Sequence, residues 1–167
     1  MNTAYEIREY RPSDEKYVAD AHMRIYKDEY NWGPAFSDYA GHIAYAFAET
    51  GPAPGEKLWI AETDGKQVGC IMLCKSEESN VGQLRLFLVE KAHRNQGIGQ
   101  ALTDTLMSEA KEAGYQKLVL WTAHPLVDAI RCYERMGFVK TESTSNTEWS
   151  LSGELVYELK YELDFGE

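Results

Sequence analysis

The pattern of hydrophobic and polar residues changes its period once in the middle of the chain, at residues 83–100. Leu84, Leu86 and Leu88 fall on one face of an extended strand, and the positions between them are also largely apolar. From Ile98 onward the apolar residues recur with helical spacing instead. This stretch therefore predicts a strand buried on both faces, a short turn and then a helix.

The same patterns predict a mixed sheet with helices in the rest of the chain. Ser13 or Asp14 is expected to cap the first helix, Asp64-Gly65 to form a hairpin turn, and Gly114 to end the third helix. Periodicity alone supports an α/β or α+β fold. The expected strands lie near 4–10, 57–62, 67–75, 83–89, 117–121, 138–144 and 155–163, and the expected helices near 14–29, 36–49, 98–113 and 126–136.

The turn before the third helix reads Arg94-Asn95-Gln96-Gly97-Ile98-Gly99, and such a junction can bind an anion. Unpaired N–H groups gather at a helix start, the helix dipole favours negative charge there, and glycine lets a phosphate come close. A turn without any ligand explains the glycines equally well. A P-loop is excluded because no glycine is followed by Lys and then Ser or Thr in the required frame, and the dinucleotide fingerprint fails because Leu102 occupies its last small position.

The pattern R-x-x-G-x-G after an apolar strand resembles the acyl-CoA loop of the GNAT superfamily of N-acetyltransferases. A second block supports the resemblance, because residues 118–138 end in A-x-x-x-Y-E-x-x-G-F, about forty residues after the loop. Together with the run HMRIYKDEYNW at 22–32, the chain looks most like a bacterial branch often fused behind a MarR-type DNA-binding domain. We expect residues 1–167 to be a single catalytic domain of that kind, standing alone.

The resemblance implies a fold and a cofactor site. The fold would be a central, mixed and mostly antiparallel sheet of about seven strands, with helices on both faces. Acetyl-CoA would bind where the fourth and fifth strands separate, with its pantetheine arm along the fourth strand and its pyrophosphate on the loop N–H groups. The implied cofactor-binding residues are Phe87, Leu88, Val89, Arg94, Asn95, Gln96, Gly97, Ile98, Gly99 and Gln100.

The resemblance also implies a catalytic tyrosine, Tyr133. By spacing alone this residue reads as a core tyrosine, whereas in relatives a tyrosine here protonates the departing CoA thiolate. Some relatives place a glutamate base early in the fourth strand, but Gln83 occupies that position and cannot act as a base. Glu29 is the leading substitute, with a solvated helix-end carboxylate as the alternative, and His124 is the second candidate.

Aromatic residues are dense in the expected first two helices and at the end of the fifth strand. Most of them belong to the core by this pattern, and an aromatic face beside carboxylates suits a cationic amine. We expect the acceptor site to include Tyr26, Trp32, Trp121 and His124.

Composition narrows the function further. The net charge of −10 disfavours nucleic acid and anionic membranes as partners, no apolar run approaches the roughly 20 residues that span a bilayer, and no signal-peptide pattern is present. The three cysteines and four histidines show no metal-ligand spacing, so no metal is expected and the thiols should be buried and reduced. A cytoplasmic protein is therefore predicted, and a homodimer is plausible by family habit.

The combined interpretation is a GNAT-type N-acetyltransferase that moves an acetyl group from acetyl-CoA to a small primary amine or amino-acid-like acceptor. No Cys or Ser stands in a nucleophile setting, so direct transfer in a ternary complex is expected. Three alternatives stay open: a peptide or protein amine as the acceptor, a non-catalytic acyl-CoA sensor favoured by Gln83, and a nucleotide-dependent oxidoreductase resting on Gly-x-Gly alone.

Overall fold

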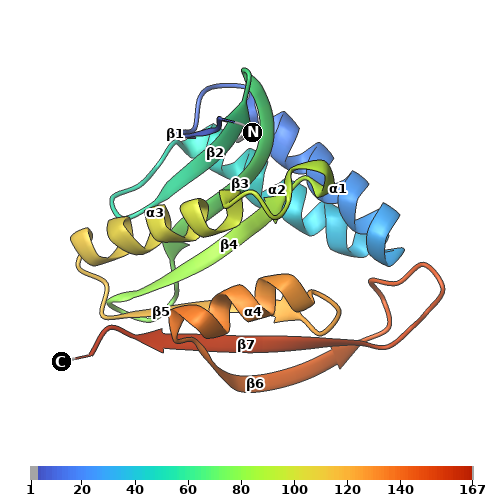
Figure 1. The fold of residues 1–167 in the computed structure, drawn as a ribbon. Coiled ribbons are helices and arrows are strands. Elements are labelled where there is room, and N and C mark those ends of the chain that lie inside the picture. Colours follow the sequence, from blue (N-terminus) through green and yellow to red (C-terminus); the bar gives the residue numbers. More distant parts are fainter. Residues whose placement is uncertain (1–3, 167) are drawn as a thin grey trace.

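A seven-stranded sheet in the order β1-β2-β3-β4-β5-β7-β6 forms the centre of the molecule (Figure 1). The computed structural model describes residues 4–166, so both ends of the expected domain lie outside the described residues. The β4–β5 pair is parallel and the other pairs are antiparallel. The elements are β1 (Glu6–Glu9), α1 (Asp14–Tyr30), α2 (Pro34–Thr50), β2 (Lys57–Thr63), β3 (Lys66–Lys75), β4 (Val81–Val89), the 3-10 turn η1 (Lys91–His93), α3 (Ile98–Glu112), β5 (Lys117–Ala123), α4 (Val127–Met136), β6 (Val139–Asn146) and β7 (Val156–Asp164).

Helices cover both faces of this sheet and make two separate apolar cores. Helices α1 and α2 pack on one face through residues such as Val18 and Phe47, and α3 packs on the other through Leu102 and Leu106. Each fully buried leucine contributes roughly 1.5–3 kcal/mol. The predicted order of strands and helices and the predicted mixed sheet are confirmed, with element ends within about three residues of expectation.

The start of α1 differs from the prediction. Ser13 has a left-handed backbone and makes no side-chain cap, so it does not fill the expected role. The buried carboxylate of Asp14 instead accepts hydrogen bonds from the Arg11 N–H, the Arg8 guanidinium and the Gln67 amide. Burial by itself raises the pKa of Asp14, but these donors outweigh it and hold the pKa below its ordinary value. The start of α1 is thereby tied to β1 and β3.

Two predicted turns are confirmed. Asp64 and Gly65 both have positive φ (52° and 75°) in the β2–β3 hairpin, as a two-residue turn with matching twist requires. Gly114 follows α3 with φ of 87°, and the N–H of Tyr115 reaches back to the carbonyl of Ala110.

A bulge in β4 changes which way its side chains point. Two residues of β4, Leu86 and Phe87, stand opposite the single residue Ile71 of β3, and Leu86 has a φ of 55°. Leu84 consequently packs in the core under α3, whereas Leu86 and Leu88 pack in the core under α1 and α2. The prediction that the three leucines share one face was wrong, because strict alternation holds only for a strand without a bulge.

The parallel pairing of β4 with β5 is short. It joins residues 81–83 to residues 117–119, and β4 then continues to Val89 without a further paired partner in β5 among residues 4–166. The later part of β4 stays paired with β3, and its other edge has no strand partner in β5. This opening is where the site lies.

Candidate functional site

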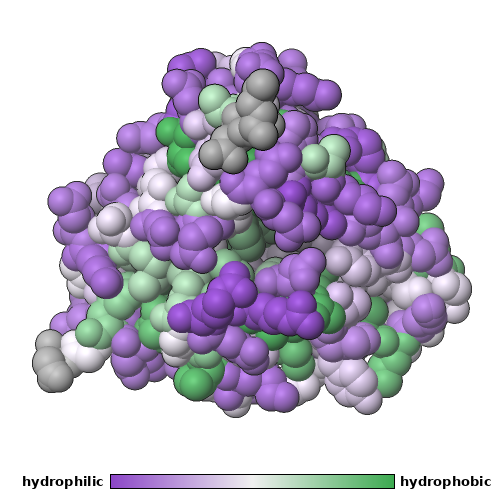
Figure 2. Space-filling model, viewed as in Figure 1, coloured by the Kyte–Doolittle hydropathy of each residue, from purple (hydrophilic) through white to green (hydrophobic). Residues whose placement is uncertain are grey.

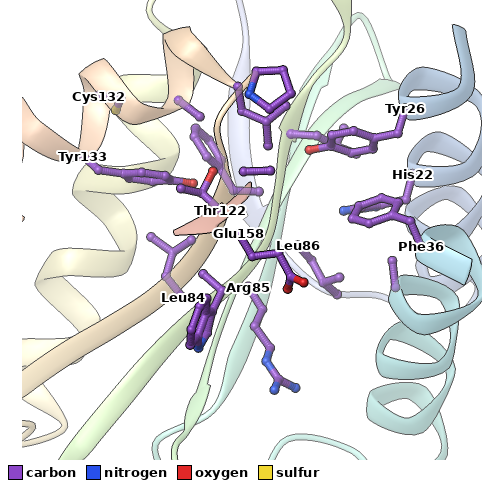
Figure 3. Close-up of a pocket in the computed structure, with 18 of the residues that line it drawn as sticks. His22, Tyr26, Phe36, Leu84, Arg85, Leu86, Thr122, Cys132, Tyr133 and Glu158 are labelled. Atoms are coloured by element: carbon purple, nitrogen blue, oxygen red, sulfur yellow. The ribbon is translucent and has the colours of Figure 1, made fainter. Parts of the chain in front are cut away.

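One large cavity of about 1430 Å³ extends through the opening between β4 and β5. Its walls come from α1 and α2 on one side, from α4 on the other, and from β4, β5 and β7 between them (Figure 3). On the face drawn in Figure 2 hydrophilic residues predominate, with less polar ones visible between α3 and α4. The two ends of the cavity have different chemistry.

At the first end the walls are the end of β4 and the loop after it. Phe87, Leu88 and Val89 line the cavity as expected, together with Arg94, Asn95 and Gly99. The remaining expected cofactor residues of this loop are not among the lining residues, namely Gln96, Gly97, Ile98 and Gln100. The side chain of Ile98 is buried in the core, so only its backbone is available to a ligand.

The loop from Asn95 to Gln100 presents a run of free N–H groups. Within the described chain these six amides have no backbone or side-chain acceptor, because they precede or form the first turn of α3. Positive φ at Asn95 (63°) and Gly97 (88°) turns the backbone so that successive amides can point toward one centre. Six such donors at the start of a 15-residue helix suit a polyanion such as a pyrophosphate.

The two glycines of the loop differ in their backbone conformation and in the space around them. Gly97 needs its left-handed conformation, which other residues rarely adopt. Gly99 has no such need, since an added Cβ would stand 3.5 Å from the Phe87 ring and 3.8 Å from a Val89 methyl, both ordinary contacts. The structure therefore leaves close approach of a ligand as the remaining physical reason for a glycine at 99.

Arg94 and Glu29 form a two-pronged ion pair beside this loop. The Arg94 guanidinium donates to both Glu29 oxygens at 2.8 and 2.7 Å, and its Nε donates to the carbonyl of Val89 at 3.0 Å. The Glu29 carboxylate, first among the causes, raises the pKa of Arg94. Glu29 thus lines the cavity, but it would serve as a base only after giving up this pair. Sequence periodicity placed Glu29 on the helix face that lines the cavity, but it could not indicate the ion pair with Arg94.

Tyr133 enters the cavity from α4. Its ring packs against Phe87 and Phe138 with centroids 6.0 and 5.9 Å apart, and its hydroxyl has no hydrogen-bond partner within residues 4–166. In Figure 3 the hydroxyl points into the opening, toward the side from which Tyr26 approaches. Burial, followed by the nearby Tyr26, raises the pKa of Tyr133 above the usual 10.0. This phenol therefore keeps its proton at neutral pH.

At the second end the cavity is roofed by aromatic residues of α1 and α2. Tyr26 stacks on Trp32 with centroids 5.5 Å apart, and Phe36 lies 4.7 Å from Tyr26. Tyr26 and Trp32 are buried and line the cavity, so the structure brings both expected residues to it. His22 lies beside Tyr26, and burial lowers its pKa to about 4, which keeps the imidazole neutral.

The floor of this end comes from strands whose register places polar side chains on one face. Trp121 stands opposite Lys160, and Glu158 stands opposite Ala123, which packs with α1 and α2. Side chains directly opposite each other share a face, so these residues lie under the same helices as Arg85. Trp121 was expected here. The sequence analysis missed Glu158 and Arg85, because they come together only through strand register and the β4 bulge.

His124 lies outside the cavity lining. Its Nδ1 accepts a hydrogen bond from the Tyr157 N–H at 3.0 Å and its ring meets the Tyr157 ring edge-on. This geometry is typical of a histidine with a structural role in the turn after β5, which was the alternative to a role in the site.

Of the three cysteines, Cys132 lines the cavity, and Cys70 and Cys74 do not. In residues 4–166 no group of three His, Cys, Asp or Glu side chains could hold a metal ion, and no helix there is both long and apolar enough to cross a membrane. Cys70, Cys74 and Cys132 are free and buried. Burial raises the pKa of Cys74 to about 11 and that of Cys70 further, so both thiols are protonated.

Solved structures share this fold. An acetyltransferase of the GNAT family from Staphylococcus aureus Mu50 superposes with a TM-score of 0.76 at 22% identity, covering 98% of this chain and all of that one. A putative acetyltransferase from Salmonella typhimurium, solved with its cofactor acetyl-CoA, superposes with a TM-score of 0.75 at 18% identity over 98% of this chain and 95% of that one.

Curated relatives align with part of the chain. Human N-acetyltransferase 8 is 32% identical over 100 residues, which is 58% of this chain and 44% of the human protein. The N-acetylaspartate synthetase of Xenopus tropicalis is 32% identical over 113 residues, which is 65% of this chain and 42% of that protein. The chain thus matches about half the length of these relatives. The model of the acetyltransferase (GNAT) family matches residues 9–138, and together with the fold and the glycine loop this shows that the chain belongs to the GNAT acetyltransferase family.

Proposed function

We propose that this chain, acting as one catalytic domain over residues 1–167, transfers an acetyl group from acetyl-CoA to the primary amine of a small molecule. One observation carries the proposal: a run of free loop amides, an unpaired strand edge and the Tyr133 hydroxyl all meet in a single cavity. The Salmonella relative that was solved with acetyl-CoA supports the same cofactor, and the names of the curated relatives support acetyl transfer to nitrogen.

The two ends of the cavity divide the binding work. The amides of residues 95–100 would hold the pyrophosphate, and the edge of β4 at Phe87, Leu88 and Val89 that does not pair with β5 would bind the pantetheine arm as a strand would. Arg94, held by Glu29 and the Val89 carbonyl, fixes the junction between the strand and the loop. The acetyl thioester would then lie between β4 and Tyr133.

The reaction we propose is direct transfer in a ternary complex. The ammonium first loses one proton to solvent, and the neutral amine then attacks the thioester carbonyl, so that the C–N bond forms and the C–S bond breaks. Tyr133 gives its proton to the leaving thiolate, and the second proton lost by the nitrogen returns through solvent to the Tyr133 phenolate. Cys70 and Cys74 do not line the cavity, and burial keeps both thiols protonated, so neither is suited to form a covalent acetyl-cysteine. The base is not Glu29 in our proposal, since its carboxylate is engaged by Arg94. Glu29 instead positions Arg94.

A small acceptor is favoured over a peptide because the segment between β6 and β7 covers the aromatic side of the second end. The segment between β6 and β7 is tied to the α1–α2 turn by backbone hydrogen bonds from Gly33 to Trp149 and from Leu151 to Asn31, both 2.8 Å. Trp149 adds aromatic contacts with Trp32, centroids 5.0 Å apart. This cover leaves less room for an extended peptide beside the aromatic residues.

The first experiment measures CoA-thiol release from acetyl-CoA with polyamines, amino acids, aminoglycosides and short peptides as acceptors. We expect turnover with one class of small amine and loss of that turnover in Tyr133→Phe. Tight acetyl-CoA binding without turnover would favour the sensor alternative, and turnover with peptides alone would favour a peptide acceptor. A cytoplasmic location, consistent with the free thiols, and a homodimer stay predictions, to be checked by fractionation and sedimentation.

A further inference from the structure

Arg85 is a half-buried cation in the cavity that has no protein partner. It stands opposite Met72, which packs in the core under α1 and α2, so it lies on the α1–α2 side of the sheet. Among residues 4–166 its guanidinium forms no salt bridge and no side-chain hydrogen bond, although it is partly removed from water. Taking a charge partly out of water without a partner is unfavourable, so this group is suited to an anion supplied by a ligand.

The other cations of the cavity are either neutralised or exposed. Arg94 is paired with Glu29, Arg131 is paired with Asp128, and Lys160 lies 3.3 Å from Glu142. Lys75 and Arg135 line the cavity but are exposed to water. Arg85 therefore stands apart as the half-buried lining cation whose charge is not balanced by a neighbour.

Glu158 supplies an opposite charge on the same face of the sheet. One of its oxygens accepts a hydrogen bond from the Asn146 amide at 2.9 Å, which fixes the carboxylate without neutralising it. The other oxygen has no hydrogen-bond donor in the part of the chain that the structure describes. Figure 3 shows the side chains of Arg85 and Glu158 extending into the same cavity below the opening between β4 and β5.

We propose that the acceptor carries a carboxylate close to its amine, as an α-amino acid does, with Arg85 binding the carboxylate and Glu158 the ammonium. This inference rests on the proposed acetyltransferase function and assigns the substrate class of the same site. A guanidinium binds a carboxylate through two parallel hydrogen bonds, and a carboxylate is a strong acceptor for an ammonium. The opposite charges also fix the orientation of the molecule, so that the amine rather than the carboxylate faces Glu158.

A polycationic acceptor is the main rival, because Glu77 and Glu78 also line the cavity. Both of these carboxylates are exposed, so water screens their attraction for a cation. Arg85 lies deeper than either and would repel a second ammonium group. The charges of the deeper residues therefore favour a zwitterion over a polyamine.

The test compares acceptors that differ only in the carboxylate. Initial rates are measured with phenylalanine, phenylalaninamide and phenethylamine, and with the same three forms of leucine and glutamate, with spermidine as the polycationic rival. Wild-type enzyme should prefer the free amino acid over its amide by about 10- to 100-fold in kcat/KM, as expected for one charge-assisted contact. Arg85→Gln should remove that preference by raising KM for the amino acid while leaving the amide unchanged. Arg11→Gln is the matched control, because Arg11 is exposed on the β1–α1 turn and does not line the cavity.

The outcomes separate this inference from the function beneath it. Turnover of amines without any preference for the carboxylate, or a preference for spermidine, overturns the acceptor class and leaves the acetyltransferase function standing. Turnover of no acceptor at all, despite acetyl-CoA binding by thermal shift, overturns both. A carboxylate preference that survives in Arg85→Gln overturns the role of Arg85. If Arg85→Gln does not fold, the wild-type comparison still decides the class, and Arg85→Lys tests the two-bond contact.

Discussion

Replacing Tyr133 with Phe removes one oxygen atom and leaves the packing in place. The ring contacts with Phe87 and Phe138, at 6.0 and 5.9 Å, do not involve the hydroxyl. The hydroxyl has no hydrogen-bond partner within residues 4–166, so its loss leaves no protein group unsatisfied. We expect the free energy of unfolding in Tyr133→Phe to stay within about 0.5 kcal/mol of wild type.

The chemical step should respond very differently. A positioned general acid contributes about 10²- to 10⁴-fold to rate, which corresponds to roughly 3–5 kcal/mol of the barrier. In Tyr133→Phe the thiolate would have to leave without a proton from the protein. The acetyl-CoA binding residues are untouched, so the Kd for acetyl-CoA should change by less than about threefold, a difference of under 1 kcal/mol.

The assay is a single-turnover measurement of CoA-thiol release, which keeps slow product release from hiding the effect. Tyr161→Phe is the control, because Tyr161 is buried in the same core and does not line the cavity. Its rate should match wild type. A single-turnover rate for Tyr133→Phe within threefold of wild type, with normal acetyl-CoA affinity, would refute the proton-donor role.

The pH dependence provides a second readout of the same group. Because burial raises the pKa of Tyr133, the phenol keeps its proton at and above pH 10. The protonated, proton-donating form of Tyr133 therefore persists to higher pH than that of a free phenol. If the wild-type rate declines near pH 10, the same decline should also be seen in Tyr133→Phe.

Three further predictions concern the loop, the ion pair and the buried histidine. Gly99→Val should have an unfolding free energy within about 1 kcal/mol of wild type, since a Cβ at this position makes ordinary contacts. Its affinity for acetyl-CoA, measured by calorimetry, should fall at least tenfold. Normal binding would show that the pyrophosphate does not approach residue 99. Glu29→Gln should raise the KM for acetyl-CoA more than it lowers kcat, because Arg94 loses its anchor, whereas a fall in kcat with a shifted pH profile would show that Glu29 is the base after all. The pKa of His22 is about 4 in the folded protein and 6.5 in the unfolded chain, so the unfolded state binds more protons between these pH values. The free energy of unfolding should therefore be highest above pH 6.5 and fall by about 2 kcal/mol on going to pH 5, as measured by urea titration. His22→Leu should flatten that slope, and an unchanged slope would contradict the assignment.

Local sequence signals determined the order of the elements and the position of the loop. Turn glycines and a change of hydrophobic period act within a few residues, so they can be read without any knowledge of the fold. For this reason the Asp64-Gly65 hairpin, the helix end at Gly114 and the junction before Ile98 were all predicted correctly. The glycines at 97 and 99 were found in the same way, although only the backbone angles and the Cβ contacts distinguish their two roles.

Tertiary structure decided whatever depends on contacts between distant segments. Glu29 and Arg94 are 65 residues apart, and their ion pair, which engages the carboxylate expected to be the base, exists only because α1 packs over the end of β4. Arg85 lies on the same face as Leu86 and Leu88 because one extra residue in β4 breaks the alternation of faces, which periodicity cannot reveal. Glu158 reaches the cavity through the register between β5 and β7. The first end of the cavity could therefore be predicted from one continuous stretch of sequence. The second end is formed by strands and helices that are distant in sequence and come together only in the folded protein.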